Sequence, residues 1–347
     1  MSTPTPLASS IGGIGLALPV HSLALLNGSV FGISGSSNYR ISIPSSSRTG
    51  TGNARKGFVH RAAKGNYEAL VATLGLISGG MIVGAIEGTG PASDSVPLFN
   101  LIFSGYLVGL GTKLSNGCTS GHMLAGLSRL SSRSFAATST FFVTAVLTAR
   151  ALHSRTFSPI GIPDWSLSST DKILIGAQLI PQLVSVLLYA HASMATMNTR
   201  TSSPPRPVAR LAALLSTTVA FALALRSSNM TDPKKVLSFL LLPVDSAFDP
   251  SLAFLAIGAL PLGIVLYHFF RGSERPALGG AWNIPKPGQV DTKLLIGSTI
   301  FGLGWGTSGF CPGPVLVNFG RAVVHGREVL PWLFWLCAFI AGGLGVN

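Results

Sequence analysis

Two short blocks, each holding one cysteine among glycines and hydroxyl residues, are the strongest candidates for chemistry in this sequence. The first reads GLGTKLSNGCTSGHMLAGLSR and contains Cys118; the second reads FGLGWGTSGFCPGPVLVNFG and contains Cys311. Glycine lets a ligand approach backbone N–H groups closely, and a helix beginning after each cysteine adds partial positive charge. A thiol is a weak, soft hydrogen-bond donor that suits a sulfur-bearing ligand better than a hard cation. The two blocks therefore predict a site for a small anion.

The two blocks also share their internal spacing. Six residues separate a GLG triplet from Cys118, and six separate a second GLG triplet from Cys311. The stretch around Ser29 resembles the first block more faintly, with serine at the position of the cysteine. Duplicated halves that meet at mid-membrane commonly form a transport pathway. We therefore expect an internal repeat, with residues 12–130 as the first half-repeat and 236–347 as the second, whose cysteine blocks meet near the bilayer centre.

Each feature also has a purely structural interpretation. Glycines and other small residues allow membrane helices to pack closely without any ligand. His122 either touches a ligand or the thiol, or makes a hydrogen bond between helices. Asn116 either donates to a ligand or caps a helix. Lys113 and Arg129, which flank the first block, either attract anions or extend toward the membrane interface.

Composition places the chain among membrane proteins. Only 10% of its 347 residues are charged, against about 25% in soluble proteins, and 47% are hydrophobic. Uncharged runs, several of them shorter than the roughly 20 residues that cross a bilayer, lie at 69–86, 97–112, 134–149, 173–190, 211–225, 251–270, 294–320 and 329–347. We expect a single all-α membrane transport domain (1–347). It should be a polytopic integral membrane protein with about eight or nine transmembrane helices, re-entrant half-helices and a pseudo-two-fold inverted repeat.

The net charge of +13 comes from cations clustered between the apolar runs. Residues 40–67 hold six cations and no acid, as cytoplasmic loops do, so we expect a flexible basic loop facing the cytoplasm from the plasma membrane. This distribution argues against nucleic-acid binding. Three cysteines in apolar sequence predict free thiols. No metal-ligand spacing and no nucleotide fingerprint occurs, so neither a metal nor a cofactor is expected.

The strings NGCTSGHMLAGLSR and GLGWGTSGFCPGP resemble the signatures of the YeeE/YedE sulfur-transport family. LLNGSVFGISG and the segment before GLGWG are also similar to that family, so the likeness covers nearly the whole chain. The resemblance implies a helical membrane protein with internal pseudo-symmetry that takes up thiosulfate, passed between cysteine thiols at a mid-membrane constriction. By motif position that role falls on Cys118 and Cys311. Characterised members use a third cysteine; here Ser29 or Cys337 takes its place, or the third contact is absent.

The sequence thus predicts a permease rather than an enzyme. Its cargo is thiosulfate or a related small sulfur anion, which an intracellular sulfur-accepting protein would receive. The expected substrate contacts are Cys118, Cys311, Asn116, Gly117, Thr119, Ser120, Gly121, His122, Gly309, Pro312 and Gly313.

Two alternatives remain open. In the first, a membrane sulfurtransferase or thiol oxidoreductase carries a persulfide on Cys118 or Cys311; in the second, the chain is a structural membrane subunit. A catalytic thiolate needs a cationic neighbour. Cys311 has no charged residue between Lys293 and Arg321, which favours passive thiols.

Overall fold

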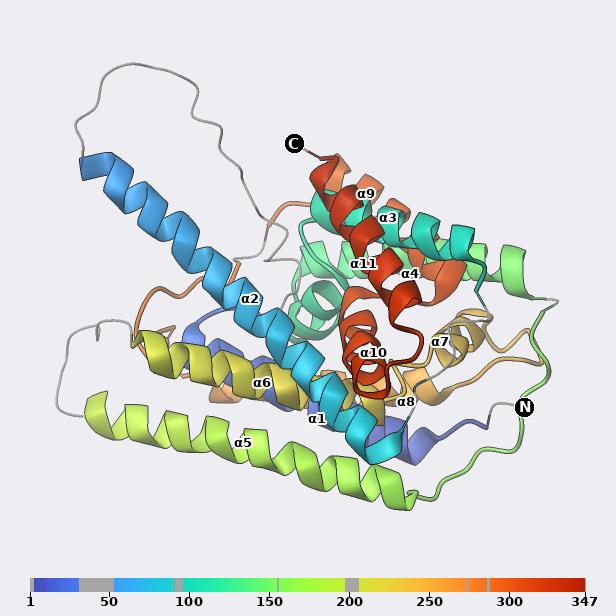
Figure 1. The fold of residues 1–347 in the computed structure, drawn as a ribbon, viewed down its shortest axis with the longest axis horizontal. Helices are drawn as coiled ribbons and strands as arrows, with labels where there is room; N and C mark the ends of the chain where they lie inside the picture. The colour runs from blue at the N-terminus through green and yellow to red at the C-terminus, as the bar shows by residue number, and fades with distance from the viewer. Residues whose placement is uncertain are drawn as a thin grey trace.

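The computed structural model describes residues 3–30, 53–88, 90, 96–154, 156–196, 206–272, 274–285 and 288–346, and only the backbone of 53–66, 195 and 196. Within these ranges all regular secondary structure is helical and no strand occurs, which confirms the all-α prediction (Figure 1). The helices are α1 (Pro6–Asn27), α2 (Asn53–Glu87), α3 (Leu98–Ser115), the π-helix η3 (Ser120–Gly126), α4 (Ser132–His153), α5 (Ser169–Thr196), α6 (Pro207–Ser227), α7 (Pro233–Leu240), α8 (Ser251–Phe270), α9 (Thr292–Ser308), α10 (Pro312–His325) and α11 (Val329–Leu344).

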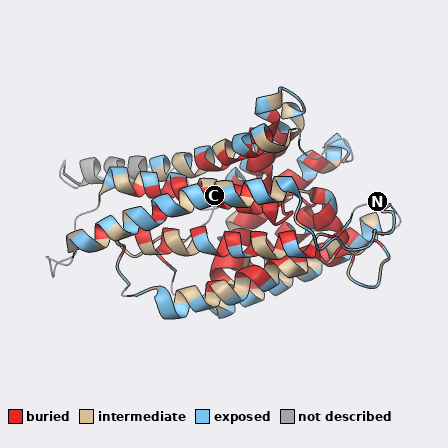
Figure 2. Ribbon diagram, turned by 90° about the horizontal axis from the view of Figure 1, so that it is seen from below, coloured by how far each residue is buried: buried red, intermediate tan, exposed pale blue. Residues whose placement is uncertain are grey.

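Seven of the described segments are long and apolar enough to cross a membrane, α9 and α10 counting together as one broken span, Thr292–His325. The sequence predicted eight or nine. The 18-residue α3 and the 16-residue α11, both apolar and shorter, account for the difference. Exposed residues line the outer faces of the peripheral helices, whereas buried ones gather inside the bundle (Figure 2). On the outermost helix, α5, the exposed side chains include Leu179, Ile180 and Leu183. Apolar faces of this extent belong against lipid, so the protein is an integral membrane protein.

Several helices end in the same way, on a left-handed residue, and one of them is α10, which ends at Gly326 (φ 61°). Gly28 (φ 64°) ends α1, Asn116 (φ 55°) ends α3 and Gly309 (φ 72°) ends α9. Only Gly and, less often, Asn adopt this conformation readily, which explains why these residue types stand at the breaks. After Gly309 the chain restarts at Pro312, whose missing N–H is not needed in a first helical turn.

The α3 and α9 helices run antiparallel at very short range because glycines face the partner backbone. A Cβ at Gly111 would collide with the Phe301 backbone, and one at Gly304 would reach the Ser104 carbonyl. Glycines also mediate the contacts of α1 with α6 and α8, and of α2 with α10. Much of the glycine content therefore serves helix packing, as the structural interpretation proposed.

The basic stretch at 40–67 differs from the prediction in part. Residues 53–67 belong to α2, so they are helical where a flexible loop was expected; residues 40–52 lie outside the described residues. The Ala, Arg and Lys residues of this segment favour helix, and the apolar run that follows extends the same helix. The glycines and serines that predicted a loop lie mainly before Asn53.

The close approach of α3 and α9 leads to a first prediction. Gly111→Ala should lower the free energy of unfolding by about 1–3 kcal/mol, because its methyl group has no space against Phe301. Thermal unfolding of the purified protein in detergent measures the change. Gly176→Ala on α5 is the matched control: its methyl group meets open space, so stability should stay equal or rise slightly. Equal melting temperatures for the two variants would contradict the packing argument.

Candidate functional site

Both motif cysteines stand where a helix begins. The Cys118 carbonyl accepts the His122 N–H at 2.9 Å, at the entry to η3. Cys311 is the extended N-cap residue of α10, and its carbonyl accepts the Val315 N–H at 3.1 Å. The backbone N–H of Gly313 interacts with the Cys311 sulfur. The expectation that a helix starts directly after each cysteine is therefore confirmed.

The structure brings the two blocks into contact across 193 positions of sequence (311 − 118). Thr119 Oγ1 lies 3.5 Å from Cys311 Sγ. Each cysteine is only 2% exposed, and Thr119 and Ser120 are buried with them. Both thiols are free. The predicted meeting of the two cysteine blocks is thus confirmed, whereas their position in the bilayer and their relation by a two-fold axis stay predictions.

The turn before Cys118 is held by its own backbone. The N–H of Gly117 donates to the Thr112 carbonyl at 3.1 Å, and Ser115 Oγ bonds the Gly111 and Gly117 carbonyls. Asn116 is the left-handed cap of α3, the structural role that the sequence left open for it. A Cβ on Gly121 would meet no atom within 4 Å, so this glycine borders open space beside the thiol turn.

His122 packs its ring against Gly117, so closely that a Cβ there would collide with it. Its Nδ1 lies 3.4 Å from Ser134 Oγ, which makes the interhelical contact that the sequence allowed. Its Nε2 is buried and has no hydrogen-bond partner among the described residues. Buried polar atoms are seldom left unpaired. This nitrogen is therefore a group that a ligand at the Cys118 turn could satisfy.

Ser29 and Cys337 do not join the cysteine pair. Ser29 follows Gly28, whose carbonyl accepts the Asn283 N–H at 2.7 Å, and it is half-buried at the end of α1. Cys337 lies exposed on α11. No contact found in the described parts of the chain links either residue to Cys118 or Cys311. A third substrate contact at either position stays a prediction.

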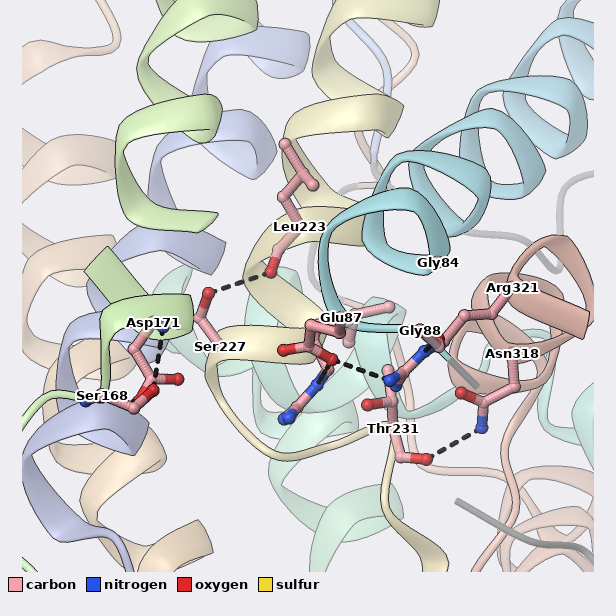
Figure 3. A network of polar contacts seen from close by, with 12 residues as sticks. Gly84, Glu87, Gly88, Ser168, Asp171, Leu223, Ser227, Thr231, Asn318 and Arg321 are labelled. Atoms are coloured by element: carbon pink, nitrogen blue, oxygen red, sulfur yellow. Dashed lines mark hydrogen bonds and ion pairs between the residues drawn. The ribbon is translucent and has the colours of Figure 1, made fainter. Parts of the chain in front are cut away.

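A polar network that the sequence analysis missed lies at the ends of α2, α6 and α10. One oxygen of Glu87 pairs with Arg226 Nε at 2.6 Å and with Arg321 Nη2 at 2.9 Å. Figure 3 shows Arg321 also reaching the Gly88 carbonyl and Asn318 donating to the Thr231 carbonyl. These residues are far apart in sequence and belong to no motif. The only sequence signal for the network was the presence of an arginine and an asparagine within an apolar helix.

Comparisons with known proteins divide the chain into two parts. The model of a family described as sulphur transport matches residues 10–147. A second model, for a family of unknown function (DUF6691), matches residues 209–344. Cys118 lies in the first match and Cys311 in the second.

Curated relatives from Xylella fastidiosa carry the name "Probable transporter". One from strain 9a5c is 32% identical over 133 residues, which are 38% of this chain and 86% of the relative. Another from that strain is 34% identical over 142 residues, 40% of this chain and 89% of the relative. One from strain Temecula1 is 34% identical over 114 residues, 33% of this chain and 76% of the relative. Each relative is therefore less than half as long as this chain. No solved structure matches it.

The contact between the blocks leads to a second prediction. In a Cys118→Ala, Cys337→Ala background, Thr119→Cys should form a disulfide with Cys311 under mild oxidation, because the two side-chain atoms lie 3.5 Å apart. Mass spectrometry of the digested protein would detect the linked peptides. The same variant with Cys311→Ala is the control. If residue 119 and Cys311 both stay freely alkylated in the oxidised protein, the two blocks do not meet.

Proposed function

The chain belongs to the sulphur transport family, and we propose that it is a permease for thiosulfate or a closely related small sulfur anion. The proposal gives the Cys118 and Cys311 thiols the role of passing the anion through a constriction between the two halves of the protein. The observation that carries it is the buried contact between Thr119 and Cys311, which joins the two motif blocks.

Thiosulfate is a dianion with one soft terminal sulfur and three hard oxygens. Removing its hydration shell in a low-dielectric interior is costly unless protein donors replace the water. The turn at Cys118 and the start of α10 supply backbone N–H groups at helix N-termini, where partial positive charge favours an anion without a formal cation. Thr119 and Ser120 add hydroxyl donors, and both are buried beside the thiols.

Each remaining residue of the predicted site has a role in this proposal. The left-handed Asn116 and Gly309 end α3 and α9, so that the chain turns away from each helix shortly before Cys118 and Cys311. Gly117 and Gly313 carry no side chain that would block the anion, although the Gly117 N–H itself is used by the Thr112 carbonyl. Pro312 begins α10 without using a hydrogen-bond donor. His122 Nε2 has no hydrogen-bond partner among the described residues. In the tautomer that carries the proton on Nε2, this nitrogen donates to the anion.

The thiols make contact without covalent chemistry in this proposal. A nucleophilic cysteine is activated by a nearby cation or base that stabilises its thiolate. The residues of the α9–α10 break around Cys311, from Trp305 to Leu316, are apolar residues, glycines, prolines and hydroxyls. A neutral thiol in such surroundings suits reversible S–H contacts to a passing sulfur atom.

We infer the orientation from charge at the two ends of the bundle. At one end Arg129 bonds the Pro285 carbonyl and Arg206 N bonds the Leu278 carbonyl. Among the residues whose side chains the structure describes, this basic end has three acids, Glu68, Glu274 and Asp291, against the cations Lys113, Arg129, Arg133, Arg206, Arg210, Arg271, Arg275 and Lys293. At the opposite, mixed end the described cations and acids are balanced. The positive-inside rule places the basic end in the cytoplasm, with the plasma membrane as the expected location.

A third prediction tests the cysteines directly. Cys118→Ala and Cys311→Ala should each abolish most thiosulfate uptake into proteoliposomes, because each removes a soft donor from the constriction. The lost volume is small, so stability should fall by only about 1 kcal/mol. Cys337→Ala, on the exposed face of α11, is the matched control and should transport normally. Normal uptake by Cys118→Ala would refute the thiol pathway.

A fourth prediction separates transport from catalysis. In a sulfurtransferase, a cysteine thiolate would attack the terminal sulfur of thiosulfate, break its S–S bond and release sulfite, leaving a persulfide on the protein. A permease forms no such bond. We expect the intact mass of the purified protein to stay unchanged after exposure to thiosulfate, with no sulfite released. A stoichiometric adduct of one sulfur atom on the protein, with release of an equal amount of sulfite, would show that the protein is an enzyme and not a permease.

A further inference from the structure

A polar cavity of about 410 Å³ opens at the mixed end of the bundle, where α6 ends and α7 begins. Its wall includes Thr5, Arg226, Asn229, Thr231, Lys235 and Arg321. Thus three cations, two of them deeply buried, border one water-accessible space. None of these residues belongs to the cysteine motifs.

Lys235 is the central group of this cavity. Its side chain comes from α7, is only 9% exposed, and Nζ donates to Thr5 Oγ1 at 2.9 Å. It forms no ion pair with any carboxylate of the described residues. Burial lowers the pKa of Lys235, against the more distant pull of Asp249 and Asp232, which raises it. An ammonium carries three donors, so this buried cation has donors to spare for an anion in the cavity.

The two arginines strengthen the positive character of the buried wall. Both pair with the same carboxylate, Glu87, which is itself 5% exposed (Figure 3). Two guanidinium groups against one carboxylate leave one positive charge in excess. The charge of Lys235 is opposed by the buried Asp249 and by Asp232, neither of which forms an ion pair with it. Opposing acids in a low-dielectric wall would cancel this charge only if they lay close to it.

The carboxylates that border the cavity accept hydrogen bonds from N–H or hydroxyl groups of residues close to them in sequence. Asp164 accepts the Ser166 N–H at 2.8 Å, Asp171 accepts Ser168 N–H and hydroxyl groups (Figure 3), and Asp232 caps α7 through the Lys234 N–H at 2.9 Å. These carboxylates are more exposed than Lys235, so water screens them more effectively. The cavity is therefore acidic at its rim and cationic at its floor.

The floor of the cavity is joined to the cysteine site. The Thr231 carbonyl accepts from Asn318 of α10 at 2.8 Å, and the Pro233 carbonyl packs against Gly309, where a Cβ would lie 2.6 Å from it. Gly309 ends α9 two residues before Cys311. Only the turn that begins α7 therefore separates the cavity from the break that carries the second thiol.

We propose that this cavity is an anion-capture site, in which the Lys235 ammonium binds a small sulfur oxyanion before the anion moves on to the thiols. The groups that line it include an ammonium, two guanidinium groups and hydroxyls, which recognise charge and oxygen atoms but not a soft sulfur. Sulfate and thiosulfate should therefore bind here about equally. The onward movement of the anion to the thiols rests on the proposed function, whereas binding of the anion in the cavity can be measured without transport.

The test uses the full-length protein in detergent, with anion binding followed by isothermal titration of sulfate and of thiosulfate. Both should bind the unmodified protein with similar affinity, and Lys235→Met should weaken both by about tenfold or more, the usual effect of losing a charged donor. Methionine fills a similar volume and removes a buried charge, so folding should be retained. Lys234→Met is the matched control: that side chain is exposed and outside the cavity, and affinity should not change.

Uptake measurements supply the second readout. Sulfate should inhibit thiosulfate uptake competitively in the unmodified protein, and Lys235→Met should raise the KM for thiosulfate and weaken this inhibition in parallel. Lys235→Arg, which keeps the charge, should preserve both. The proposal is overturned if sulfate neither binds nor competes, or if Lys235→Met binds sulfate normally.

The cysteine variants distinguish this inference from the proposed function. Cys311→Ala should bind sulfate with unchanged affinity, because the thiol lies beyond the cavity. Loss of sulfate binding in that variant would place the sulfate site at the thiol and not at Lys235. Normal uptake by the cysteine variants, together with lost binding in Lys235→Met, would refute the thiol pathway and leave the capture site standing.

Discussion

The requirement that every backbone polar group inside a membrane finds a partner within the protein governs this structure. A helix satisfies that requirement by itself, whereas a broken helix does so only where other protein segments enclose the break. The break after Asn116 is enclosed by α9, whose Gly297 lies against the Ser115 backbone, and the break at Gly309 is enclosed by Pro233 and Leu237 of α7. The backbone N–H groups that a helix would have used then face a protein interior. The two thiols lie at these breaks, which are the places where unpaired donors can be tolerated and an anion can use them.

Each half of the chain contributes one thiol, and the contact between α3 and α9 joins the halves. The sulphur transport match ends before α5, and the second match begins in α6. Curated relatives less than half as long as this chain carry a transporter name. A site shared between Thr119 and Cys311 would be incomplete in either half alone. A covalent connection between the halves keeps the two breaks together without a concentration-dependent assembly step.

The local signals in the sequence predicted the helical fold and the helix starts after both cysteines, whereas the matching spacing of the two blocks predicted that they meet. They worked because left-handed glycine or asparagine and an N-terminal proline act through adjacent residues. They failed at Asn53, where α2 begins within the expected loop, and at the Glu87, Arg226 and Arg321 cluster. Such a cluster depends on which helix ends meet in space, and no local pattern reports that. The same holds for Lys235: an ordinary lysine in sequence becomes a buried cation only through the fold.

The cavity and the cysteine site, as proposed, would divide selection of the anion into two physical steps. Charge is recognised most effectively where an anion still holds most of its water, because partial desolvation costs little and Lys235 offers a strong Coulomb attraction. Charge alone separates sulfate from thiosulfate poorly, since the two have similar shape and the same charge. The difference between them is one soft sulfur, and only a soft donor in a dry site can use it. Lysine or arginine at the constriction would instead bind either dianion too firmly to release it. Neutral thiols and backbone N–H groups hold the anion more weakly, which favours onward movement and leaves discrimination to sulfur contacts.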